Sequence, residues 1–264
     1  MKFGQGQKVI ITGASTGIGR AIAIELAKGG AQLGLIARRE ELLLELVNEI
    51  QTLGGKAFYR VADISERKET LIGISELVNC MGGIDILIAN AGVGAPTTIQ
   101  PFNVETQEKM IKVNLLGVIY CIEAILQTML ASEKGQIVAI SSLAGFKGLP
   151  GESGYTASKA GLNTFMEGMR IQLRPKNIFV STICPGFIKT PMTEVNNEED
   201  MPWLMDAETA AKIIIKAIQR KTKVLRFPWQ TSLLMRITGL LPDWLIERVM
   251  KKYNENPPMP KNAL

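Results

Sequence analysis

Short apolar runs alternate with longer helical segments along the first two-thirds of this 264-residue chain. Several of the runs, such as VIIT, DILIAN and QIVAIS, lack the regular polar alternation of a strand that has one face in water. Strands of this kind are typical of a parallel sheet that helices cover on both faces. The repeated strand and helix units therefore predict an α/β protein with a doubly wound parallel sheet, in which a ligand binds at the carboxyl ends of the strands.

The same pattern places the individual elements. Strands are expected at residues 8–12, 33–37, 56–61, 84–89, 135–141, 178–183 and 224–227, and helices at 16–28, 40–53 and 65–81, with another beginning near Asp206. One core suits this length, because single cores stop growing at roughly 250–300 residues. We expect one domain over residues 1–227 and an amphipathic helical extension with a disordered tail over 228–264.

The chain contains no histidine. Ser-His-Asp triads, Cys-His pairs and histidine-ligated zinc therefore do not apply, and no metal site is expected. Any proton chemistry has to use tyrosine, lysine, cysteine or carboxylates. Cys80, Cys121 and Cys184 are far apart in apolar surroundings, which predicts buried free thiols in a reducing compartment.

The sequence predicts neither a secretory leader nor a membrane span. The first apolar run leads straight into glycines, and the longest one, LLGVIYCIEAILQTML, contains Glu123 and Gln127. We therefore expect a soluble, cytoplasmic protein.

The net charge of +5 comes from the C-terminal part of the chain. Residues 216–264 carry ten Lys or Arg and three Asp or Glu, a balance of +7, whereas the residues before them sum to −2. From 227 to 253 the basic residues are interleaved with Leu, Ile, Met and Trp, which argues against nucleic-acid binding. Two interpretations stay open: these helices pack over a pocket or a second subunit, or they make a peripheral contact with anionic lipid.

A glycine-rich stretch, TGASTGIG, follows the first predicted strand and opens a helix. Glycines here allow a tight turn and let the N–H groups of a helix N-terminus approach a pyrophosphate. The alternative is a turn with a structural role alone. The residues that would bind the phosphates are Gly13, Ser15, Thr16, Gly17, Ile18 and Gly19.

The second predicted strand ends in GLIARRE. A carboxylate at this point binds the ribose hydroxyls of NAD, whereas the 2′-phosphate of NADP attracts arginine. Arg38 and Arg39 therefore favour NADP, and Glu40 keeps NAD as the less favoured cofactor. Two ordinary solvated arginines are the remaining alternative.

Further motifs follow in order: AD at 62–63, NAG at 90–92, VN at 113–114, ISS at 140–142, YTASK at 155–159 and PG at 185–186 followed by Thr190. Together with the glycine-rich turn, this set resembles the short-chain dehydrogenase/reductase family over roughly residues 7–227. The resemblance implies a Rossmann fold and an NAD(P)-dependent enzyme. It implies Asn114, Ser142, Tyr155 and Lys159 as the catalytic set, and Asp63, Ile64, Asn90, Ala91, Gly92, Tyr155, Lys159, Pro185, Gly186, Ile188 and Thr190 as cofactor contacts.

Tyr155 and Lys159 are four residues apart, so they share one face of a helix. A free tyrosine, with a pKa near ~10, is a poor base at neutral pH. The lysine charge beside it is expected to favour the phenolate and to make Tyr155 a general acid or base. Within the resemblance, Ser142 binds the substrate oxygen and Asn114 holds a water for proton transfer.

These observations predict an NADP-dependent oxidoreductase that interconverts a carbonyl and an alcohol on a small lipophilic substrate. Residues 187–205 are expected to form a mobile lid, over a wall that contains Val93, Leu143, Leu149, Pro150 and Phe187. The apolar helix at 112–130 is expected to build a homodimer or homotetramer. A non-catalytic nucleotide-binding regulator and a same-fold epimerase or dehydratase remain the alternatives.

Overall fold

A computed structural model describes residues 3–194 and 196–251 and shows a parallel sheet of seven strands. The strands are β1 (Lys8–Thr12), β2 (Gln32–Ala37), β3 (Lys56–Val61), β4 (Ile86–Ala89), β5 (Gly135–Ile140), β6 (Ile178–Pro185) and β7 (Val224–Phe227). Their spatial order is β3-β2-β1-β4-β5-β6-β7. The direction of winding reverses between β1 and β4, and ligands bind such sheets at this switch point.

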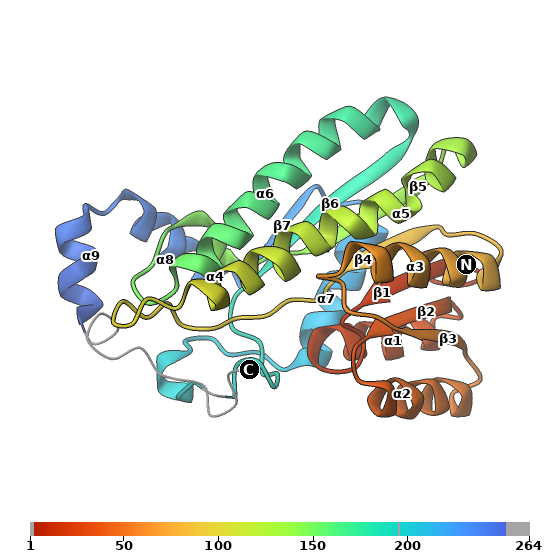
Figure 1. Cartoon of the computed structure of the whole chain (residues 1–264), viewed down its shortest axis with the longest axis horizontal. Coiled ribbons are helices and arrows are strands. Elements are labelled where there is room, and N and C mark those ends of the chain that lie inside the picture. Colours follow the sequence, from red (N-terminus) through yellow and green to blue (C-terminus); the bar gives the residue numbers. More distant parts are fainter. Residues whose placement is uncertain (1–2, 195, 252–264) are drawn as a thin grey trace.

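Helices cover both faces of the sheet (Figure 1). One core forms under α1 (Gly17–Lys28), α2 (Glu40–Thr52) and α7 (Ala207–Gln219), and a second under α3 (Arg67–Met81), α5 (Gly117–Ser132) and α6 (Ser153–Leu173). Because both faces are covered, nearly every residue of β1, β2 and β5 is buried. The remaining helical elements are α4 (Val104–Ile111), the π-helical η1 (Lys112–Leu116), the 3₁₀ turns η2 (Leu143–Phe146), η3 (Arg174–Lys176) and η4 (Glu198–Asp200), α8 (Trp229–Leu240) and α9 (Asp243–Val249).

The predicted fold class is confirmed. All seven predicted strands form, and their ends and those of the first three helices lie within two residues of the predicted positions. α7 begins after Asp206, whose carboxylate accepts a hydrogen bond of 2.6 Å from the N–H of Thr209. The domain boundary at residue 227 stays a prediction, and the tail predicted to be disordered, residues 254–264, lies outside the described residues.

Cys80 contradicts the expectation that all three thiols are buried. Cys121 and Cys184 are buried, whereas Cys80 is exposed on α3. The helix buries Ile74, Leu77 and Met81, and Cys80 lies beside that stripe rather than within it. Its sulfur is 3.9 Å from the guanidinium of Arg60.

Among the described residues, one helical run, Val104–Ser132, is long and apolar enough to span a membrane by length and composition. The sequence predicted no such span. The difference arises because α4, η1 and α5 join without a break into 29 helical residues. In the fold, Cys121, Ile125 and Met129 of this run pack in the core under α3, α5 and α6.

Candidate active site

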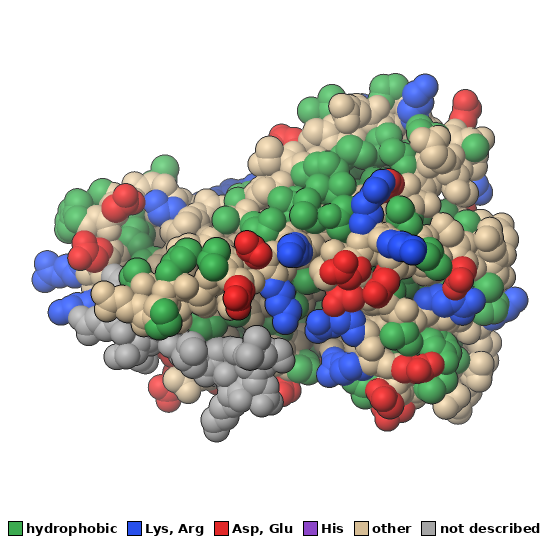
Figure 2. Space-filling model, in the orientation of Figure 1, with side chains coloured by type: hydrophobic (Ala, Val, Ile, Leu, Met, Phe, Trp, Pro, Cys, Tyr) green, Lys and Arg blue, Asp and Glu red, His purple; other side chains and the backbone are tan. Residues whose placement is uncertain are grey.

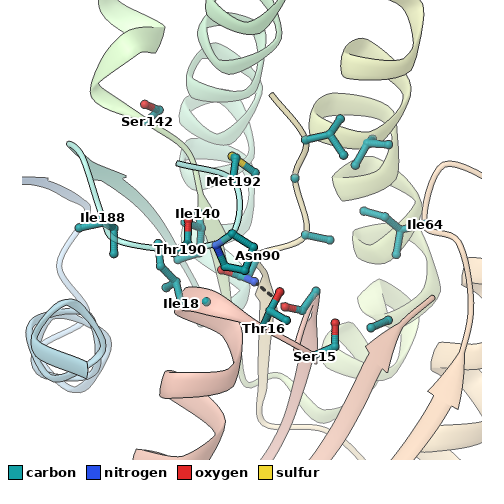
Figure 3. Close-up of a pocket in the computed structure, with 18 of the residues that line it drawn as sticks. Ser15, Thr16, Ile18, Ile64, Asn90, Ile140, Ser142, Ile188, Thr190 and Met192 are labelled. Carbon is teal, nitrogen blue, oxygen red and sulfur yellow. Dashed lines mark hydrogen bonds between the residues drawn. The ribbon is translucent and has the colours of Figure 1, made fainter. Parts of the chain in front are cut away.

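The predicted site residues converge on one pocket at the carboxyl ends of β1, β2, β4, β5 and β6. All of them line it except Gly19 and Asn114. Figure 3 shows Ser15, Thr16 and Ile18 at the start of α1, Asn90, Thr190 and Met192 above them, and Ser142 at the end away from Ser15. Residues outside the predicted set also line the pocket: Ala37, Ala62, Val113, Ile140, Ser141, Pro191, Met192 and Thr193.

The glycine-rich turn leaves the first turn of α1 open to an anion. Gly13 and Gly17 have φ of +64° and +57°, the left-handed region that glycine adopts without strain. Thr16 makes no capping hydrogen bond, and the first turn of the helix contains no acidic residue. Backbone N–H groups at such a helix N-terminus suit a pyrophosphate, so the turn fits the phosphates of a dinucleotide.

Gly19 shapes this turn from beneath instead of lining the pocket. A Cβ added there would lie 2.4 Å from the carbonyl oxygen of Gly13 and 2.5 Å from Nδ2 of Asn90. Asn90 donates from Nδ2 to the carbonyl oxygens of Thr12 and Gly13, at 3.0 and 3.1 Å. The Thr12 hydroxyl accepts the N–H groups of Asn90 and Ala91, at 3.1 and 3.2 Å. Thr12 thus links the ends of β1 and β4. This role was not predicted, because nothing in the sequence around Thr12 indicates it.

The end of β2 presents both arginines to the pocket. Nη2 of Arg39 donates to the Thr16 hydroxyl at 3.2 Å, across the glycine-rich turn. Nη1 of Arg38 lies 3.5 Å from the carboxylate of Asp63, at the end of β3. Burial raises the pKa of Asp63, but the hydrogen bonds from Ser65 and the charge of Arg38 outweigh burial and leave that pKa lowered.

Glu40, the carboxylate that kept NAD as an alternative, does not line this pocket. Its Oε1 accepts a hydrogen bond of 3.0 Å from the Tyr59 hydroxyl, on β3. The Glu40 carboxylate, which would bind the ribose hydroxyls of NAD, is therefore hydrogen bonded to Tyr59 instead.

Asn114 is fully buried in the π-helical turn η1, outside the pocket wall. Its Oδ1 accepts the N–H of Val93 at 2.8 Å, and its Nδ2 donates to the Val93 carbonyl at 2.9 Å and to the Ser158 hydroxyl at 3.0 Å. Ser158 in turn donates to the carbonyl of Tyr155 at 2.7 Å. Asn114 thus links the loop after β4 to the helix that carries Tyr155. Its predicted role in holding a water stays a prediction.

Ser142, Tyr155 and Lys159 meet at the far end of the pocket. Ser142 follows β5 and lines the pocket together with Tyr155, and its hydroxyl accepts the N–H of Ala144 at 3.1 Å. Nζ of Lys159, one turn along α6, lies 5.8 Å from the centre of the Tyr155 ring. The amine donates to the carbonyl oxygen of Ile140 at 3.1 Å.

The protonation of this pair differs from the sequence expectation. Burial raises the pKa of Tyr155 to about 12, although the hydrogen bond with Ser142 lowers it in part. Burial also lowers the pKa of Lys159 to about 8. Loss of water on burial is the largest cause of both shifts. The Tyr155 hydroxyl is therefore protonated at neutral pH.

The predicted lid contributes three further residues to the pocket, Pro191, Met192 and Thr193. The Thr193 hydroxyl donates to the carbonyl of Ile188 at 2.7 Å and accepts the N–H of Thr190 at 3.0 Å. Of the predicted wall residues, Val93 lines the pocket, whereas Leu149 and Pro150 line a separate groove between α6 and α9. Leu143 is buried, and neither it nor Phe187 lines the described pocket.

A glycine-rich turn that suits phosphates, two arginines after β2 and a Ser-Tyr-Lys cluster line one pocket at the edge of a doubly wound sheet, an arrangement typical of dinucleotide-dependent oxidoreductases. A family model described as short chain dehydrogenase matches residues 7–201. The chain belongs to the short-chain dehydrogenase/reductase family. It is a dehydrogenase/reductase enzyme whose fold binds a nicotinamide dinucleotide.

Similar proteins cover most of the chain. An uncharacterized oxidoreductase of Myxococcus xanthus is 37% identical over 243 residues, which are 92% of this chain and 96% of that protein. Ketoacyl reductase HetN of Nostoc sp. is 31% identical over 254 residues, which are 93% of this chain and 88% of that protein. A short-chain dehydrogenase/reductase structure from Mycobacterium marinum has a TM-score of 0.78 at 26% identity, covering 84% of this chain and 94% of that one.

Proposed function

We propose that the protein is an NADP-dependent reductase of small lipophilic ketones or aldehydes, with Tyr155 as the proton donor. One observation carries this proposal: Tyr155, whose pKa burial raises to about 12, and Ser142 line the same pocket as the glycine-rich turn. A protonated hydroxyl in this position suits reduction, because a carbonyl that becomes an alcohol has to gain a proton on its oxygen.

In the proposed reaction, the substrate carbonyl oxygen lies between the hydroxyls of Ser142 and Tyr155. Ser142 donates a hydrogen bond that orients this oxygen, and Tyr155 transfers its proton to it. A nicotinamide cofactor held in this pocket would supply the hydride that the carbonyl carbon gains. The ammonium group of Lys159, on the same helix face, stabilises the phenolate that Tyr155 becomes. Asn114 positions these groups by holding α6 against the loop after β4.

The choice of NADP rests on the charges at the end of β2. Arg38 and Arg39 both line the pocket, and a planar guanidinium binds phosphate through paired hydrogen bonds. Glu40, the nearest carboxylate in sequence, is bonded to Tyr59 instead. Arg39 contacts the glycine-rich turn, whereas Arg38 is already paired with Asp63. We therefore assign the 2′-phosphate chiefly to Arg39.

Arg39→Ala is expected to lower kcat/KM with NADPH by roughly 10- to 100-fold, because one hydrogen bond to a charged group contributes about 1.5–3 kcal/mol. The value with NADH should change less than about twofold. Arg38→Ala should have the smaller effect of the two. Steady-state kinetics with both cofactors measure these changes, and Arg220→Ala, an exposed arginine at the far end of α7, is the matched control. Equal losses with NADPH and NADH would contradict the assignment.

The proposed substrate is lipophilic because the pocket wall near Tyr155 is apolar. A Cβ built on Gly94 would lie 3.6 Å both from the sulfur of Met192 in the lid and from the ring of Tyr155, and Val93 and Ile188 line the same pocket. The similarity to a ketoacyl reductase is consistent with a ketone on an acyl chain. A series of ketones and aldehydes of rising chain length tests the proposal, and kcat/KM with NADPH should rise with chain length.

We also propose a homodimer or homotetramer and a cytoplasmic location. Members of this family usually form oligomers, and the run 112–130 that was expected to form the contact lies within the helical run Val104–Ser132. Sedimentation measurements would determine the subunit number. We further propose that residues 1–227 form the catalytic domain and 228–264 a separate C-terminal extension.

A further inference from the structure

α8 buries polar residues and exposes large apolar ones, the reverse of an ordinary surface helix. Its two buried residues, Thr231 and Ser232, are polar. Surface helices normally bury apolar residues and expose polar ones. The helix instead exposes Trp229 by 69% and Leu240 by 86%, and α9, which buries only Ile246, exposes Trp244 by 64%. We call the exposed large apolar side chains of the two helices the C-terminal apolar face: Trp229, Leu233, Leu234, Ile237, Leu240, Trp244 and Val249.

This face lies at one end of the molecule. Figure 1 shows α9 beyond α8, away from the strands of the sheet. Figure 2 shows hydrophobic atoms over this end with acidic and basic side chains among them. Single exposed apolar residues are ordinary, but a set concentrated on two neighbouring helices marks a contact surface.

A groove between β7 and α8 adds positive charge beside the apolar face. Its lining residues are Val224, Arg226, Trp229, Ser232, Leu233 and Arg236. The guanidinium of Arg226 lies 4.0 Å from the centre of the Phe146 ring, and its Nε is buried without a hydrogen-bond partner among the described residues. Among the described residues, no carboxylate lies within salt-bridge distance of Arg226 or Arg236.

The charge around the face favours an anionic partner. From β7 onward, residues 226–251 contain four Lys or Arg and two Asp or Glu. A two-fold contact with a second copy would bring two copies of the same net positive surface together, which charge repulsion opposes. Tryptophans and leucines flanked by basic side chains suit the boundary between lipid headgroups and acyl chains. We propose that the C-terminal apolar face docks on an anionic lipid bilayer, with Arg226 and Arg236 binding lipid phosphate.

The docking face adjoins the substrate end of the catalytic pocket. α8 begins against Gly186, a pocket residue, where an added Cβ would lie 3.3 Å from Cγ2 of Thr231. The helix also packs on η2, which follows Ser142. In the docked protein the substrate end of the pocket would therefore lie close to the bilayer, and a lipophilic substrate would bind there. This last step rests on the proposed function, whereas the docking itself does not.

Vesicle co-sedimentation of the full chain tests the docking. The protein is expected to pellet with vesicles of phosphatidylcholine and phosphatidylglycerol, and much less with phosphatidylcholine alone. Binding should weaken as salt rises, because salt screens the attraction between exposed charges. Equal binding to both vesicle types, or binding to neither, would overturn the proposal.

Two sets of variants separate the apolar and the charged contributions. Leu240→Ser with Trp244→Ser should weaken vesicle binding at least about tenfold, because each side chain leaves water on docking. Ile99→Ser with Ile171→Ser, which are 75% and 71% exposed elsewhere, is the matched control and should bind normally. Arg226→Gln with Arg236→Gln should weaken binding roughly 25-fold, at about fivefold per charge. Lys176→Gln with Lys212→Gln, two exposed lysines, is the control of equal charge.

The remaining outcomes are distinct. Arg236→Gln alone, on an exposed side chain, should still weaken binding about fivefold if the Arg226 variant proves unstable. If Leu240→Ser with Trp244→Ser changes the subunit number and leaves vesicle binding intact, the face is a contact between copies and the proposal fails. Turnover of a short, water-soluble ketone should be unchanged in all these variants. Vesicle binding without any NADPH-dependent turnover would contradict the proposed function alone.

Discussion

Tyr155→Phe is expected to lower kcat/KM for carbonyl reduction by roughly 10²–10⁴-fold, the usual contribution of a positioned general acid. Phenylalanine keeps the ring that packs near Gly94 and Lys159 and removes only the hydroxyl. Binding of NADPH should change little, because the phosphate-binding turn and Arg39 are untouched. Steady-state NADPH oxidation with a reactive ketone measures the first effect, and calorimetric titration with NADPH measures the second.

Tyr120→Phe is the matched control for this variant, since Tyr120 is also half-buried and lies outside the pocket. It should keep wild-type turnover. If Tyr155→Phe kept its turnover, Tyr155 would not be the proton donor. If the variant instead lost NADPH binding, the tyrosine would act on the cofactor rather than on the substrate.

Lys159→Met is expected to lower the activity of the enzyme and to raise the stability of its fold. Removing the charge that stabilises the Tyr155 phenolate should lower kcat roughly 10²- to 10³-fold. The same change should stabilise the fold, because Lys159 is buried and its pKa falls from 10.5 to about 8. This pKa difference means that burying the charged lysine costs the folded state about 3 kcal/mol. Removing the lysine also loses its hydrogen bond to the Ile140 carbonyl, which reduces the gain in folding stability by about 1 kcal/mol. The net gain of about 2 kcal/mol would raise Tm by about 4–8 °C.

The stability of the wild-type protein should carry the matching pH dependence. The pKa of Lys159 is lower in the folded than in the unfolded state, so the unfolded chain binds the proton more tightly between the two values. The cost of the buried charge is therefore fully present below pH 8. It shrinks as pH rises from about 8 to 10.5 and is absent above that range. Lys159→Met should lack this rise in stability.

Denaturant unfolding at fixed protein concentration, at pH 7 and pH 9.5, measures both effects. Lys216→Met on the exposed side of α7 is the control and should stay within about 0.5 kcal/mol of wild type. A Lys159→Met protein that is less stable than wild type at pH 7 would contradict this account. The lysine would then contribute more through its contacts than its burial costs.

The sheet and most of the cofactor pocket were predictable because local pattern and global fold agree there. Strands such as VIIT and QIVAIS are apolar throughout, and that pattern arises only where both faces are covered. The glycine-rich turn comes directly after β1, and the two arginines come directly after β2. Once the strands were assigned correctly, these residues could be placed at the carboxyl ends of the sheet, where the pocket lies.

The remaining features depend on contacts between distant residues. The Tyr59 hydroxyl engages Glu40 across 19 positions of sequence, and Asn114 reaches Val93 and Ser158 across 21 and 44 positions. The pKa directions of Tyr155 and Lys159 depend on burial, which helical spacing alone does not determine. The reversed pattern of α8 could also not be predicted, since apolar residues at helical spacing usually point inward.

The most direct test of the central claim is a single reaction in which NADPH consumed and alcohol formed are both measured, with a lipophilic ketone as substrate. We predict one molecule of alcohol for each NADPH, with NADH a poor replacement and Tyr155→Phe inactive. A product that forms without net consumption of NADPH would identify an epimerase or dehydratase. Tight NADPH binding with no turnover across the ketone series would contradict the assignment as a carbonyl reductase.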